Sequence, residues 1–158
     1  MGQSLWVPYP EHEFRYRDMP VFWRYHSGVE EDGIKVYAMQ FVAFYETEHY
    51  AWLAPAYWLT GAYGNPEPER WLAEWKSKRN RYAIKKVLKT AERSYAFSSK
   101  KLAMEGFLRR KKYHLMRLKQ DIAVVTTLVD GLKNVDESSL SDDYNFGHNA
   151  ETESWVFL

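Results

Sequence analysis

One segment has the regular spacing of a long amphipathic helix, and it constrains the fold more than any other feature. Between residues 100 and 134, mostly apolar side chains recur at alternating steps of four and three, the spacing of a coiled-coil seam. The positions are Met104, Leu108, Lys111, Leu115, Leu118, Ile122, Val125, Val129 and Leu132. The last six of these are named the oligomer seam. Ser99 is placed to cap the helix.

The length of this helix sets its packing. A continuous helix over residues 100–134 would measure about 50 Å, which is longer than a small sheet can cover. We therefore expect part of the seam to contact another partner, such as a second copy in a homo-oligomer.

The chain before this helix has strand patterns. Residues 34–47 are rich in β-branched and aromatic side chains, and neither of their two faces is polar enough for open solvent. Residues 50–54 read as the returning strand of a hairpin, and residues 21–25 add another strand. The links are too short for helical crossovers. We predict an α+β fold, an antiparallel sheet followed by one long C-terminal helix.

The connection between sheet and helix is less regular. Residues 61–69 form a loop by their Gly and Pro content, and Pro68 opens a short helix. Residues 82–97 predict further short strands or an irregular connection. A chain of 158 residues suits one core, so we expect a single domain over residues 1–135 and an acidic tail over residues 136–158.

Composition excludes several classes of protein. The chain has no cysteine, which rules out disulfides, thiolate metal sites and a cysteine nucleophile. The first residues lack the basic start and apolar run of a signal peptide, and no stretch is apolar for long enough to span a bilayer. We therefore expect a soluble, intracellular protein with no membrane partner.

Charge is sorted along the chain. Residues 70–119 hold 17 Lys or Arg and three acids, whereas the remaining residues hold five bases and 18 acids. Cations neutralise phosphates, and aromatic rings interleaved with them can stack on bases. This pattern predicts a basic surface that binds nucleic acid or an acidic host protein. Its residues are Lys76, Lys78, Arg79, Arg81, Lys85, Lys86, Arg109, Arg110, Lys112, Tyr113 and Arg117.

A plainer interpretation of the same charges stays open. The bases can be solvated faces that the protein's own acids balance. Residues 136–153 carry six acids and no base, and this segment can fold back onto the basic helix.

Catalytic motifs are weak in this chain. Its five histidines lie far apart in sequence, and we expect no catalytic site, no metal site and no cofactor. The nearest nuclease-like motif pairs Glu74 with Lys76, which on a strand would set a metal-binding carboxylate beside an amine. Asp18 or Asp32 would have to supply the second ligand. Helical spacing across residues 71–75 is the simpler interpretation.

A set of motifs between Val36 and Leu118 carries a resemblance. The motifs are Tyr45-Glu46-Thr47, Trp52-Leu53, Tyr95-Ala96-Phe97-Ser98-Ser99, Ala103, Phe107 and Arg109-Arg110-Lys111-Lys112. This combination resembles small, uncharacterised proteins encoded in tailed-phage genomes. The chain departs from them by an insertion at residues 65–76. The resemblance implies a phage origin and an accessory role, which would place the protein in the cytoplasm of the bacterial host. These proteins have no established activity, so the resemblance names no catalytic residue.

Three classes of function stay open, in this order. The first is a non-enzymatic phage inhibitor or counter-defence factor that uses the basic surface against nucleic acid, a small anion such as a signalling nucleotide, or the acidic face of a host nucleic-acid-handling protein. The second is a virion or assembly component that oligomerises through the long helix. The third is a small metal-dependent nuclease built on Glu74 and Lys76.

Overall fold

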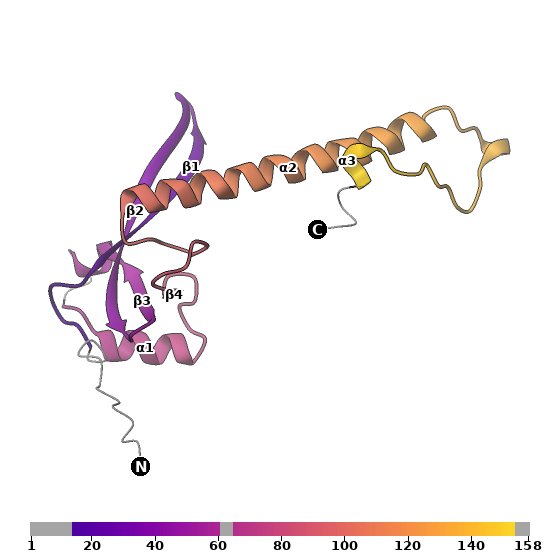
Figure 1. The fold of residues 1–158 in the computed structure, drawn as a ribbon. Helices are drawn as coiled ribbons and strands as arrows, with labels where there is room; N and C mark the ends of the chain where they lie inside the picture. The colour runs from indigo at the N-terminus through magenta and orange to yellow at the C-terminus, as the bar shows by residue number, and fades with distance from the viewer. Residues whose placement is uncertain (1–13, 61–64, 154–158) are drawn as a thin grey trace, which may run out of the picture. The chain divides into compact units, whose positions relative to one another are not determined.

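The computed structural model of the chain describes residues 14–60 and 65–153 (Figure 1). The predicted α+β class, an antiparallel sheet followed by a long C-terminal helix, is confirmed. The elements are β1 (Val21–Glu30), β2 (Gly33–Glu46), β3 (Tyr50–Pro55), a 3₁₀ turn (Ala56–Leu59), α1 (Pro68–Lys76), β4 (Lys85–Leu88), α2 (Lys100–Leu132), a second 3₁₀ turn (Glu137–Ser139) and α3 (Ala150–Glu153).

These residues fall into two compact units, which divide within α2 between Leu108 and Arg109. The sheet unit contains β1 to β4, α1 and the first turns of α2. The helical unit contains the rest of α2 and the segment that follows it, through α3. The division lies inside the span of residues 1–135 that the sequence analysis assigned to one domain.

The sheet pairs its strands in chain order. Within the described residues, the order is β1-β2-β3-β4 and every pair is antiparallel. Strand β2 pairs with β1 from Gly33 to Val42 and with β3 from Phe41 to Glu46, so it belongs to two hairpins. Its register shifts between Ala43 and Tyr45, and such a bulge bends and twists a strand.

Away from the outer half of the β1–β2 hairpin, both faces of the sheet are buried, as its alternating apolar residues require. One cluster comprises Phe22, Phe41, Ala43, Ala51, Leu53, Val87 and Ala96. The other comprises Phe44, Trp52, Ala54, Trp71, Leu72 and Ile84. Helix α1 covers the second cluster, where the ring of Trp71 lies 5.4 Å from that of Phe44 and the ring of Trp75 lies 5.8 Å from that of Trp52. The predicted short helix is therefore a core element.

The outer half of the β1–β2 hairpin is exposed. Val29 and Ile34 pair with each other across the strands, and their side chains are 85% and 80% exposed. Lys35 forms ion pairs of 2.9 Å with Glu30 and 3.0 Å with Asp32 beside them. The expectation that both faces of residues 34–47 are buried is thus wrong for the first half of β2, because apolar pattern alone does not show how far a neighbouring layer extends.

The start of α2 packs closely on the sheet unit. Ser99 caps the helix as predicted, since its Oγ accepts a hydrogen bond of 3.2 Å from the backbone N–H of Leu102. Phe97 forms an isolated antiparallel bridge with Trp23. A Cβ on Gly106 would lie 2.5 Å from the Phe97 ring, so glycine permits this approach. Residues 95–97 therefore join the start of α2 to β1 through a single bridge and do not form a full strand.

In the helical unit, the chain after α2 returns along one face of that helix. The Phe146 ring lies against Gly131, where a Cβ would collide with it. On the same side, Gln120 and Ala123 are buried. Asp136 begins the intervening 3₁₀ turn with a reciprocal capping box to Ser139. Hydrogen bonds from Ser138 and Ser139 lower the pKa of the Asp136 carboxyl.

Candidate nucleic-acid interface

The residues of the predicted basic surface form two groups, one in each unit. The sheet unit holds Lys76, Lys78, Arg79, Arg81, Lys85 and Lys86, and the helical unit holds Arg109, Arg110, Lys112, Tyr113 and Arg117. The structure brings each group together locally, and a single surface made of both stays a prediction.

The first group centres on a turn named here the basic loop, residues 76–82, with the sequence Lys-Ser-Lys-Arg-Asn-Arg-Tyr. It joins the end of α1 to the segment before β4. All seven residues are exposed, and Tyr82 is 96% exposed. The loop contains four cations, one aromatic ring and no acid.

Backbone hydrogen bonds define the shape of the basic loop. The N–H of Arg79 donates to the carbonyl of Glu74 at 2.8 Å, and the N–H of Ile84 donates to the carbonyl of Asn80 at 2.9 Å. Lys78 and Asn80 adopt left-handed φ angles of 66° and 52°. Asn tolerates this region, and a left-handed residue commonly ends a helix.

Glu74 anchors the loop from the last turn of α1. One of its carboxylate oxygens accepts a hydrogen bond of 3.0 Å from Arg70 Nε, and the other accepts one from the Asn80 side chain. Arg70 also contacts Glu67 at 3.0 Å. The hydrogen bond from Arg70 to Glu74, with the charges of Glu67 and Glu74, raises the pKa of Arg70. The acid nearest the loop in sequence therefore has cationic and amide partners of its own.

The helical interpretation of residues 71–75 is confirmed, and Glu74 and Lys76 do not have the strand geometry that the nuclease-like motif would need. Both residues lie in α1, and helix positions two apart do not face each other. The residues the structure describes contain no group of three His, Asp or Glu side chains that could hold a metal ion.

Two predicted contact residues are engaged within the sheet unit. The Lys85 ammonium donates to the Arg81 carbonyl at 2.8 Å and lies 5.1 Å from the centre of the Tyr95 ring. The Lys86 ammonium lies 4.1 Å from the centre of the Tyr50 ring. Such cation–π contacts favour the observed positions, so these two lysines are less available to a partner than the loop cations.

The second group lies on α2. Arg109, Lys112 and Tyr113 are exposed, and positions three or four apart share one helix face. The chain after α2 lies against that helix farther along, where residues 144–148 and Thr152 line a pocket with Val124, Thr127 and Leu128. The acidic residues 136–153 therefore lie along the C-terminal half of α2.

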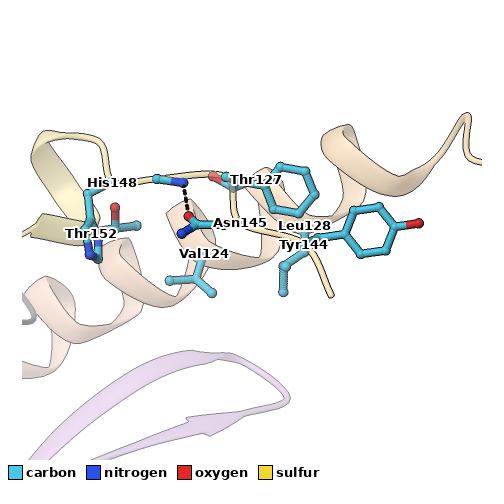
Figure 2. A pocket seen from close by; sticks show the side chains of 9 residues that line it. Val124, Thr127, Leu128, Tyr144, Asn145, His148 and Thr152 are labelled. Carbon is cyan, nitrogen blue, oxygen red and sulfur yellow. Dashed lines mark hydrogen bonds between the residues drawn. The ribbon is translucent and has the colours of Figure 1, made fainter. Parts of the chain in front are cut away.

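That pocket is shown in Figure 2. Its volume is about 270 Å³, slightly below the roughly 300–1,000 Å³ of typical small-molecule sites. Its polar groups serve local structure, because Asn145 Oδ1 accepts from the Gly147 N–H at 2.8 Å and the Thr127 hydroxyl donates to the Ala123 carbonyl at 2.8 Å. We interpret the pocket as a packing gap between α2 and residues 144–152, not as a ligand site.

The oligomer seam is exposed on α2. Its six side chains are between 37% and 64% exposed. Leu115, Leu118, Ile122 and Val129 lie away from the helix positions that meet the chain after α2, such as Val124 and Gly131, whereas Val125 and Leu132 flank Leu128, which lines the pocket. Oligomerisation through the seam stays a prediction.

Sequence reasoning missed one feature of this region, because Asn80 provides the side chain that ties the loop to Glu74. Of the two alternatives for the segment that begins at Tyr82, the irregular connection holds at Tyr82, which lies outside the strands. The asparagine between two arginines was an available signal, because Asn favours turns. Trp75, interleaved with the bases in sequence, packs on Trp52 in the core.

Comparisons with protein-family models, with curated proteins and with solved structures found no match to this chain. Among the helices of residues 14–60 and 65–153, none combines the length and the apolar content that crossing a bilayer requires.

Proposed function

We propose that this chain is a non-enzymatic binding protein whose basic loop binds nucleic acid. One observation carries the proposal: residues 76–82 expose four cations and a nearly fully exposed tyrosine on a hydrogen-bonded turn. Phosphates pair with such cations, and an unstacked base can lie on such a ring. In this proposal the protein acts as a phage-encoded inhibitor or counter-defence factor.

The arrangement favours single strands over duplexes. An exposed aromatic ring stacks only on bases that are not already stacked, whereas cations serve both forms. Neutralising four phosphates of a single strand would give a slope of about −3 for log K against log salt concentration.

The test is fluorescence anisotropy with labelled single- and double-stranded DNA and RNA across a salt series. The triple variant Lys78→Glu, Arg79→Glu, Arg81→Glu should lose binding with little change in thermal stability, since exposed charges contribute little to folding. The matched control reverses Arg109, Arg110 and Lys112 on α2. If only the α2 variant loses binding, the interface is on α2 and the loop proposal is wrong.

Variants of Tyr82 separate the contribution of base stacking to binding from the contribution of charge attraction. Tyr82→Ala should weaken single-strand binding about tenfold, because stacking contributes about 1–3 kcal/mol per base. Tyr82→Phe keeps the ring and should bind as the native chain does. No binding by the native chain would overturn the proposal and favour an acidic protein as the partner.

A second candidate function, an assembly component that oligomerises through α2, is supported by the exposed oligomer seam. Light scattering over a range of protein concentrations tests it, because self-association follows mass action.

A further inference from the structure

The distal part of α2 has two different apolar faces. On the first face, Val124, Thr127 and Leu128 line a pocket with residues 144–148 and Thr152, and Phe146 contacts Gly131. The second face is the oligomer seam, six large aliphatic side chains that stay exposed. Contiguous apolar rows of this kind usually mark an interaction surface.

We propose that two copies of the chain pair through this seam with their helices antiparallel. The steps along the seam are three, four, three, four and three, a pattern that reads the same in both directions. An antiparallel partner can therefore match every position. In this register Leu115 lies opposite Leu132 of the second copy, Leu118 opposite its Val129, and Ile122 opposite its Val125.

Charge selects the antiparallel orientation. Within α2, residues 109–119 contain six bases and no acid, whereas residues 120–132 contain two acids and no base. Parallel helices would set the two basic segments side by side, with Lys111 facing its own copy within the seam. Antiparallel helices instead set each basic segment beside residues 120–132 of the partner, whose charges are the carboxylates of Asp121 and Asp130. Opposite charges attract and like charges repel at such distances.

Because the chain contains no cysteine, introduced cysteines can report the orientation without background. The variants are Leu115→Cys and Leu132→Cys, each a small change at an exposed position. In the antiparallel pair, the two copies of residue 115 lie about 26 Å apart, since the rise is about 1.5 Å per residue. A disulfide needs Cα atoms within roughly 7 Å. Neither variant should cross-link alone, and an equimolar mixture should give a disulfide dimer under mild oxidation.

Each other outcome overturns the proposal. Cross-linking of each variant alone would show parallel helices. No cross-linking in the mixture, whether light scattering of the native chain gives a monomer or a dimer, would show that the seam does not pair as proposed. Leu140→Cys is the matched control, because Leu140 is 66% exposed but lies outside α2, and it should cross-link with neither seam variant.

The pairing is independent of the nucleic-acid proposal. The seam lies in the helical unit and the basic loop in the sheet unit, so each has its own variants and its own measurement.

Discussion

At the scale of single residues, Glu46 shows how one side chain holds distant parts of the sheet unit together. It is 4% exposed, and its carboxylate forms ion pairs of 2.9 Å with Arg15 and 3.1 Å with Lys89. A buried charge is tolerated only when it is paired in this way. The Glu-Thr pair on which the phage-protein resemblance partly rests thus begins with a structural residue.

We expect Glu46→Gln to lower the free energy of unfolding by about 1–3 kcal/mol, because the partly buried cations of Arg15 and Lys89 would lose their charged partner. Urea denaturation measures this change. Glu48→Gln is the control, since the Glu48 side chain is 73% exposed, and it should have almost no effect. Equal effects of the two variants would contradict the structural role of Glu46.

Gly106 is a second residue with a defined structural role. Gly106→Ala would place a methyl group against the Phe97 ring, and overpacking costs about 1–3 kcal/mol while Ala regains about 1 kcal/mol in helix propensity. We expect a net loss of about 0–2 kcal/mol by urea denaturation. Gly28→Ala serves as the control, because a Cβ there would lie 3.9 Å from the Tyr37 hydroxyl, which is ordinary contact. A stabilised Gly106→Ala variant would contradict the close approach.

Residue roles that depend on neighbours in the sequence could be predicted, and roles that depend on residues far away in the sequence could not. The Ser99 cap follows from the few residues around it, and the structure confirms it. The partners of Glu46 lie far away in sequence, so no local pattern identifies them. The tie between Asn80 and Glu74 depends on the exact turn of the chain after α1, which residue spacing does not specify.

At the scale of elements, periodicity predicted the long helix well. The expected span of residues 100–134 compares with Lys100–Leu132 in the structure, because helix spacing is a local property repeated over many turns. The short strand β4 was harder to predict, since only four residues pair and their partner β3 lies far back along the chain. The cations of the basic loop were predicted as part of a basic surface, but the turn that carries them was not, because it depends on hydrogen bonds from residues beyond the helix end.

The oligomer seam leads to a testable prediction about the role of α2 in dimer formation. Leu118→Asp should convert the proposed dimer to a monomer, because a charge would be buried at the interface. Helicity of the monomer should change little, since Leu118 is 45% exposed there. Light scattering with circular dichroism measures both. Leu140→Asp, outside α2, should stay dimeric, and an unchanged dimer for Leu118→Asp would count against the seam.

At the scale of the whole molecule, the two units differ in how much apolar surface they bury. The sheet unit has two clusters of large buried side chains. In the described part of the helical unit, Ala123 is the one buried apolar residue. Regions with few buried contacts open at lower free energy than a packed core.

We therefore expect two separate unfolding transitions in urea at low protein concentration. The far-ultraviolet signal of α2 should fall first, and the near-ultraviolet signal of the tryptophans in the sheet unit should follow. Raising the protein concentration should shift the first transition upward if copies associate through the helical unit. Coincident transitions for both probes would show one cooperative unit instead.

The pairing of strands in chain order also has a consequence for how quickly the sheet forms. Two residues separate β1 from β2 and three separate β2 from β3, whereas 29 separate β3 from β4. Closing the longer connection costs about 2 kcal/mol more entropy than closing a three-residue turn, if both behave as flexible loops. We expect β2 to act as a template on which both neighbouring hairpins close early, and the arrival of β4 to limit the rate at which the native sheet is completed.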